Sequence, residues 1–251
     1  MDRAGIVAMV ACALAVACEA EGDLVRKPDT VTILAAASLT DAFDELGRRL
    51  ERSHPGLTVR LGFAASSTVA TQVVEGAPAD ILATADLRTM RIAEEAGALA
   101  GDPVVFARNT LVIAVPPGNP AGVSSLADLA RPQVRVALCA RPVPCGAAAA
   151  AVLGAAGISV TPVTWEQNVR AVLTKVTLGE VDAGLVYATD GRAAGNRVEA
   201  IPFPEAGAAV NAYPIAIVKG SSNPEAARAF VDLVLSQVGK GVLRDAGFEV
   251  P

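Results

Sequence analysis

Residues 31–50, which read VTILAAASLTDAFDELGRRL, decide the fold of this chain. The run at 31–34 is short and rich in β-branched side chains, which predicts a buried strand. Apolar residues then recur at helical spacing, at Leu39, Phe43, Leu46 and Leu50. An amphipathic helix should therefore follow the strand. Ser38 stands at the junction, where we expect it to cap the helix with Asp41 as its capping-box partner.

The same alternation of strand and helix continues along the chain. Strands are predicted at 57–63 and 80–83, with a helix opened by Ser66-Ser67-Thr68 between them and one capped by Asp86 after them. This βαβα order predicts a parallel, doubly wound α/β sheet.

Two further apolar strands, predicted at 109–115 and 212–218, enclose a second α/β set. The last helices have no strands of their own and should return to the first set. We therefore predict two lobes with mixed, mostly parallel sheets, joined by two crossing strands that act as a hinge. Lobe 1 comprises residues 29–110 plus 215–251, and lobe 2 comprises residues 111–214. A ligand cleft is expected between them.

The N-terminus is predicted to be an export segment, with residues 1–17 as a signal peptide. Arg3 precedes an apolar run from Ile6 to Ala17, which is too short for a membrane span. Cys18 follows small residues, as in a lipoprotein signal, so it is the expected lipidation site, with residues 18–28 as a tether. An ordinary secretory signal with an incidental Cys18 is the alternative.

Cys139 and Cys145 lie close together in a chain expected to enter an oxidising compartment, which predicts a disulfide bond. A zinc site is the alternative, but two thiolates with no nearby His or third Cys make a poor one.

Several function classes find no support. The net charge of −5 opposes nucleic-acid binding. His54, the single His, precedes a Pro in a turn, so a Ser-His triad would have to be built on it. Nucleotide-binding loops and metalloprotease motifs are absent from the sequence. We expect no enzyme activity and no cofactor.

Ser38 and Ser66 each follow a strand and stand at the start of a helix. The first turn of a helix offers free N–H groups and the positive end of a dipole. Two such starts facing one cleft could bind an oxyanion. For either Ser alone, a plain helix cap remains the alternative.

The chain resembles the periplasmic molybdate-binding proteins of ABC importers (the ModA family) from about Val31 to Phe248. The matching motifs, in order, are LAAASLTDA at 34–42, FAASST at 63–68, GAPADILATAD at 76–86, NTLVI at 109–113, VPCG at 143–146, NVR at 168–170, GLVYATD at 184–190 and YPIAI at 213–217.

This resemblance implies the two-lobed, type II periplasmic-binding-protein fold and a site with five uncharged donors. The implied donors are the hydroxyls of Ser38, Ser66 and Tyr187 and the backbone N–H groups of Cys145 and Val169. Ser67 is the alternative to Ser66. Charged residues are expected to stay outside the site: Arg170 should pair with Glu166, and the acidic side chains should act as caps or hinge supports, at Asp80, Asp86 and Asp190.

The implied function is an exported, monomeric receptor that captures molybdate and tungstate. It would deliver them to the permease and ATPase of an ABC importer, from the outer face of the cytoplasmic membrane or the periplasm. Molybdenum would be present only as bound molybdate. The alternatives are a receptor of the same fold for another ligand such as sulfate, an exported serine hydrolase, and the effector domain of a transcription regulator.

Overall fold

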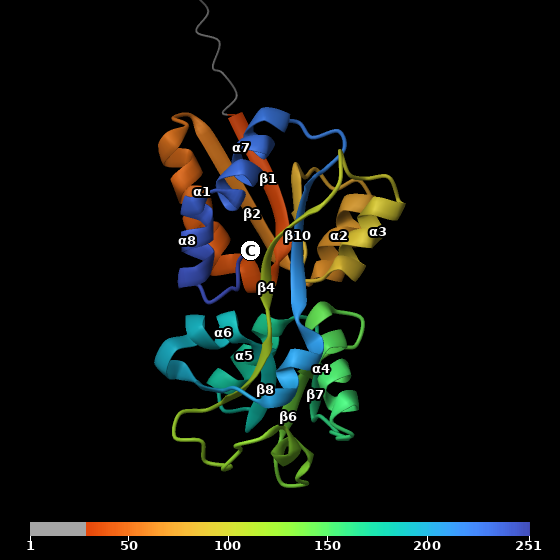
Figure 1. Ribbon diagram of the computed structural model, residues 1–251, viewed down its shortest axis with the longest axis vertical. Coiled ribbons are helices and arrows are strands. Elements are labelled where there is room, and N and C mark those ends of the chain that lie inside the picture. The colour runs from red at the N-terminus through yellow and green to blue at the C-terminus, as the bar shows by residue number, and fades with distance from the viewer. Residues whose placement is uncertain (1–28) are drawn as a thin grey trace, which may run out of the picture.

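The computed structural model describes residues 29–251, which form two lobes, each built on a five-stranded sheet (Figure 1). The predicted signal peptide, tether and lipidation site at Cys18 lie outside the described residues. Within residues 29–251, no helix combines the length and apolar character needed to cross a membrane.

The sheet of the first lobe has the order β2-β1-β3-β10-β4. Its strands are β1 (Asp29–Ala36), β2 (Leu57–Ala64), β3 (Ile81–Ala83), β4 (Val104–Asn109) and β10 (Asn211–Ile217). β1 is parallel to β2 and β3, whereas β10 is antiparallel to β3 and β4. The helices lie on both faces, as Figure 1 shows, with α1 (Thr40–Ser53), α7 (Pro224–Leu235) and α8 (Gln237–Asp245) on one and α2 (Ser66–Val74) and α3 (Leu87–Glu95) on the other.

The sheet of the second lobe has the order β7-β6-β8-β5-β9. Its strands are β5 (Leu111–Val115), β6 (Val136–Cys139), β7 (Thr164–Glu166), β8 (Ala183–Tyr187) and β9 (Glu199–Ile201). Its helices are α4 (Pro144–Ala155), α5 (Val169–Thr177) and α6 (Ala188–Ala194). Both sheets mix parallel and antiparallel pairs, so the predicted α/β fold with two mixed sheets is confirmed.

The lobes are joined at two crossings that differ from the predicted ones. The strand expected at 109–115 is two strands, because β4 ends at Asn109 and β5 begins at Leu111, in the other sheet. β10 belongs to the first sheet along its whole length, since Asn211 pairs with Asn109. The second lobe therefore ends before Asn211 and not at residue 214. β10 continues through Pro214 to Ile217. The pairing with β4 shifts register between Tyr213 and Pro214, and such an irregularity accommodates a proline within a strand.

Aromatic side chains connect the core of the first lobe to the junction between the lobes. The ring of Tyr213, in β10, packs edge-on against Phe106 and Phe248, with ring centroids 6.4 and 5.2 Å away. Tyr187, at the end of β8, packs edge-on against the same ring at 6.0 Å. Tyr213 is thus held rigidly between the two sheets.

Candidate functional site

A small cavity of about 20 Å³ lies between the lobes. It is lined by Ala36, Ala37, Ser38, Ala64, Ala65, Ser66, Ala85, Val143, Pro144, Cys145, Asn168, Val169 and Tyr187. The structure therefore brings together all five predicted donor residues. None of these lining residues is Asp, Glu, Lys, Arg or His, and the many Ala side chains leave the backbone close to the cavity.

Ser66 is the first residue of α2 and is almost fully buried. Its Oγ accepts a hydrogen bond from the backbone N–H of Ala85 at 2.9 Å. Since that bond uses a lone pair, the hydroxyl hydrogen of Ser66 remains available to a group in the cavity. Ser67, the predicted alternative, is only half-buried and is not among the lining residues.

Ser38 lies in a short 3₁₀ turn, η1 (Ala37–Leu39), that runs into α1. Its Oγ is 2.9 Å from the hydroxyl oxygen of Tyr213. The predicted capping role of Ser38 is wrong: no side chain caps η1 or α1, and Asp41 pairs with Arg170 instead.

Ser66 does not cap its helix either, because the capping position of α2 is Ala65. Both hydroxyls are therefore held by distant partners at the cavity, and the plain-cap interpretation fails for both serines.

The second lobe directs the starts of two helices at the cavity. Cys145 is the second residue of α4, after Pro144, and Val169 is the first residue of α5. Backbone N–H groups in these positions have no acceptor within their own helix. Asn168 caps α5 by accepting from Ala171 N at 3.0 Å, and it also lines the cavity. Sequence reasoning missed Asn168, although an Asn before an apolar helical run is a capping signal.

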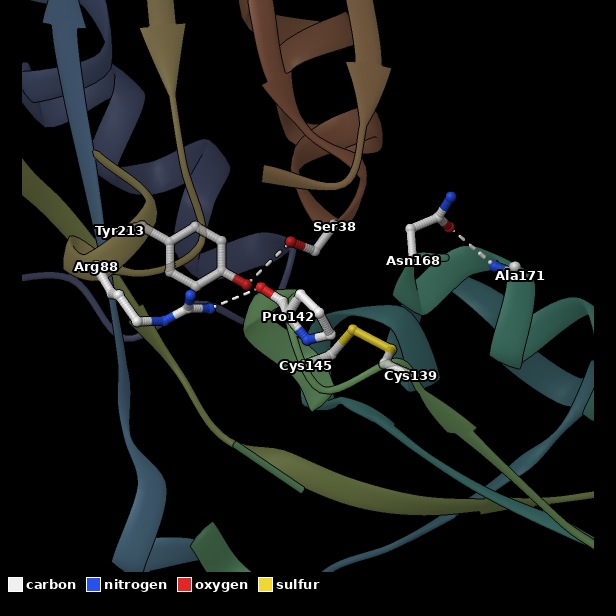
Figure 2. The surroundings of a disulfide bond; sticks show 8 residues. All are labelled: Ser38, Arg88, Cys139, Pro142, Cys145, Asn168, Ala171 and Tyr213. Carbon is white, nitrogen blue, oxygen red and sulfur yellow. Dashed lines mark hydrogen bonds between the residues drawn. A yellow bond between two sulfur atoms is a disulfide. The ribbon is translucent and has the colours of Figure 1, made fainter. Parts of the chain in front are cut away.

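Cys139 and Cys145 form a disulfide bond, the predicted pairing (Figure 2). The bridge closes the loop that carries Val143, Pro144 and Cys145 to the cavity. The loop packs tightly against the helix, since a Cβ on Gly146 would lie 2.0 Å from the carbonyl oxygen of Ala140. Backbone contact and covalent bridge together fix the direction of the Cys145 N–H.

Tyr187 is 1% exposed, and its hydroxyl makes no well-oriented hydrogen bond among residues 29–251, although the Tyr213 hydroxyl lies near enough to interact with it. Burial raises the pKa of Tyr187 well above its ordinary value, so the hydroxyl stays protonated and can donate. A buried, unpaired hydroxyl costs about 1–3 kcal/mol. Because it lies on the cavity wall, this hydroxyl can donate to a group that enters the cavity.

Arg170 ties the two lobes together beside the cavity, and its predicted partner is wrong. It pairs with Asp41 of α1 and lies 2.8 Å from Asp190 of α6. Glu166 instead accepts a hydrogen bond from Thr164 at 2.8 Å. A second link joins the Arg88 guanidinium of the first lobe to the carbonyl oxygen of Pro142, at 2.8 Å (Figure 2). Both links favour the closed arrangement of the lobes.

The remaining acidic side chains that were singled out in the sequence do not line the cavity. Asp86 caps α3 through Thr89 N at 2.7 Å, as predicted. Asp80 accepts bonds from Thr32 N and Ser221 Oγ, at 2.7 and 2.6 Å, and so holds the segment after β10 against β1.

Asp190 predicts a pH dependence of stability. Its side chain is fully buried, and burial raises its pKa to about 7, against the opposing effect of Arg170. The unfolded chain releases this proton near pH 3.8, whereas the folded protein keeps it until about pH 7. Raising the pH across that window therefore favours unfolding, by up to about 4 kcal/mol.

We expect Asp190→Asn to remove the part of the pH dependence of stability that the ionisation of Asp190 causes. The free energy of unfolding, measured by urea denaturation from pH 4 to 8, should fall less steeply with pH in the variant than in the wild type. Equal slopes would contradict the assignment. The other carboxyl groups contribute equally to the slopes of the wild type and the variant, so their effect cancels in the difference.

Neither His54 nor a metal-binding cluster provides a second site within residues 29–251. His54 is exposed at the end of α1, with its Nδ1 2.9 Å from Ser53 Oγ, and it does not line the cavity. In the part of the chain that the structure describes, no three His, Cys, Asp or Glu side chains are grouped to hold a metal ion.

Comparisons with known proteins agree with this architecture. Residues 31–249 match the family model described as bacterial extracellular solute-binding protein. The molybdate-binding protein ModA of Mycobacterium tuberculosis is 43% identical over 222 residues, covering 88% of this chain and 85% of that protein.

Two solved structures share the fold. The periplasmic molybdate-binding protein of Azotobacter vinelandii has a TM-score of 0.76 at 19% identity, covering 88% of this chain and 99% of that one. The sulfate-binding protein SubI of M. tuberculosis has a TM-score of 0.74 at 19% identity, covering 88% and 86%.

Proposed function

The chain belongs to the family of bacterial extracellular solute-binding proteins, and we propose that its solute is molybdate, which it delivers to an ABC importer. The 43% identity to a molybdate-binding protein supports this choice of solute. The observation that carries it is the unpaired hydroxyl of Tyr187 on the wall of an uncharged cavity.

Molybdate suits a cavity that offers only donors. At neutral pH it is a fully deprotonated tetrahedral dianion, so each of its oxygens can only accept hydrogen bonds. Ser38, Ser66 and Tyr187 would supply hydroxyl hydrogens, and Cys145 and Val169 would supply backbone N–H groups. Hydrogen bonds to a charged partner are stronger than neutral ones. Two helix starts add their positive dipole ends, which stabilise an anion without any cationic side chain.

The same donors would select among anions. Hydrogen phosphate carries a proton that would meet a donor and leave a buried polar group unpaired, at about 1–3 kcal/mol. Sulfate has no such proton and would be rejected only because its oxygens lie closer to the centre of the ion. Tungstate nearly matches molybdate in size and charge, and we propose that it binds as well. None of the lining residues is charged, so the cavity lacks the Arg and Asp side chains that an amino-acid site would use.

Export and anchoring complete the proposal. Residues 1–17 would be removed as a signal peptide, Cys18 would carry lipid, and residues 18–28 would tether a monomeric receptor to the outer face of the cytoplasmic membrane. Its protein partners would be the permease and ATPase of the importer. We propose no catalytic role for Ser38 or Ser66, because neither hydroxyl is paired with a base.

An anion series tests the solute. Purified protein should gain thermal stability with molybdate and tungstate, much less with sulfate, and not with phosphate. Binding to the folded state alone stabilises by about 4 kcal/mol at a thousandfold excess over Kd. Absence of a shift with molybdate would exclude the proposed solute. A larger shift with sulfate would favour the second candidate, a sulfate receptor, which the similar fold of a sulfate-binding protein keeps open.

A further inference from the structure

The hydroxyl of Ser38 stands at the end of a chain of hydrogen bonds that starts in the crossing between the lobes. Asn109 Oδ1 accepts from the backbone N–H of Thr110 at 3.0 Å. Asn109 Nδ2 lies 2.8 Å from Thr189 Oγ1 and 3.4 Å from the hydroxyl oxygen of Tyr213. That hydroxyl is 2.9 Å from Ser38 Oγ, and Figure 2 shows it pointing at Ser38.

The direction of the hydrogen bonds that Asn109 makes follows from the backbone N–H at the start of this chain. A backbone N–H can only donate, so the atom of Asn109 that faces Thr110 N must be the oxygen. The amide nitrogen of Asn109 therefore faces Tyr213 and donates to its oxygen. The Tyr213 hydroxyl hydrogen is then available to Ser38 Oγ, and we assign Tyr213 as the donor of that bond, with the Tyr187 hydroxyl as the other nearby acceptor. Ser38, which accepts from Tyr213, is left with its own hydrogen to direct into the cavity.

We propose that Tyr213, oriented by Asn109, is a positioning residue that holds Ser38 as a hydrogen-bond donor toward the bound anion. This inference rests on the proposed function, since it assumes an oxyanion in the cavity. Tyr213 does not line the cavity and acts through Ser38. With its hydrogen directed at the anion, Ser38 presents a donor where the proton of hydrogen phosphate would need an acceptor, which selects against hydrogen phosphate.

The position of Tyr213 suits this role. Its side chain is fully buried, and three aromatic rings hold it in place. Burial also raises the pKa of Tyr213 far above its ordinary value, so its hydroxyl has a hydrogen to donate at every pH at which the protein is folded. Ser38, by contrast, would be free to rotate its hydroxyl hydrogen if the Tyr213 hydroxyl were absent.

Tyr213→Phe tests the inference, because it removes the hydroxyl and keeps the ring. Titration calorimetry at pH 8 should show molybdate affinity reduced about tenfold, as Ser38 is no longer held as a donor. Affinity for hydrogen phosphate should stay equal or rise, because the Ser38 hydroxyl can now rotate and accept a hydrogen bond from its P–O–H group. The ratio of the phosphate Kd to the molybdate Kd should therefore fall at least tenfold. An unchanged ratio would overturn the inference.

Ser38→Ala provides the matched control. If Tyr213 acts through Ser38, adding Tyr213→Phe to Ser38→Ala should change the selectivity ratio less than twofold. Additive effects in the double variant would mean that Tyr213 acts by another route and would overturn the inference. If the wild type prefers sulfate to molybdate, molybdate is not the solute. The ratio of the phosphate Kd to the sulfate Kd would then still decide the role of Tyr213.

Discussion

Val169→Pro is expected to lower the affinity for molybdate by a hundredfold or more in a protein that still folds. Val169 is the first residue of α5, so its N–H has no acceptor within the helix. Proline removes this hydrogen and puts a ring carbon in its place, facing the anion. The loss of a hydrogen bond to a charged group costs about 1.5–3 kcal/mol, and the ring carbon adds a steric penalty.

The backbone at this position accepts proline, which separates the loss of binding from unfolding. Proline is favoured at the first helical position. The preceding residue, Asn168, has φ −156° and ψ 170°, an extended conformation that a following proline permits. Val169→Ala is the matched control, since it shortens the side chain and keeps the N–H. Calorimetry should show near wild-type affinity for Val169→Ala, and equal losses in the two variants would contradict the role of the N–H.

Tyr187→Phe should weaken binding and stabilise the empty protein at the same time. The hydroxyl of Tyr187 is buried without a partner among the described residues, and its removal relieves a cost of about 1–3 kcal/mol. The free energy of unfolding without ligand should rise by a similar amount. Affinity for molybdate should fall by one to two decades, because the anion loses a donor.

Tyr213→Phe is the natural comparison for this stability measurement. Tyr213 is as deeply buried as Tyr187, but its hydroxyl is bonded to Ser38. Its removal should therefore destabilise the empty protein by about 1 kcal/mol. If the Tyr187 hydroxyl is reserved for the ligand, urea denaturation without ligand should show that the free energy of unfolding rises in Tyr187→Phe and falls in Tyr213→Phe. A loss of stability in both would show that Tyr187 has a partner in the empty protein.

Much of the fold follows from local patterns in the sequence. The apolar run at 31–34 and the helical spacing after it correspond to β1 and α1, and Asn223-Pro224 starts α7 as its capping signal indicates. Strands β7 and β9 were not predicted, because, unlike the equally short β3, they are partly exposed and contain no apolar run. The break at Thr110 was missed because no Gly or Pro marks it.

The cavity-lining donors were predicted from sequence motifs, but the residues that hold them in place were not. Ser38 and Tyr213 are 175 residues apart, so no spacing in the sequence connects them. Arg170 illustrates the opposite error, since Glu166 four residues earlier is a reasonable helical partner. In the structure Glu166 belongs to β7, before α5 begins, and the pairing that local spacing suggests does not form. Tertiary packing brought Asp41 and Asp190 to Arg170 instead.

The place of β10 in the first sheet also bears on the order in which the chain folds. β10 lies between β3 and β4 and pairs with both, so the sheet of the first lobe cannot be completed until residues 211–217 have been made. The second lobe is continuous in sequence and can fold as soon as it has been made. A chain that emerges N-terminus first thus leaves the first lobe open until last. Completion of the first sheet therefore waits for the C-terminal segment, which places this step at the end of chain synthesis.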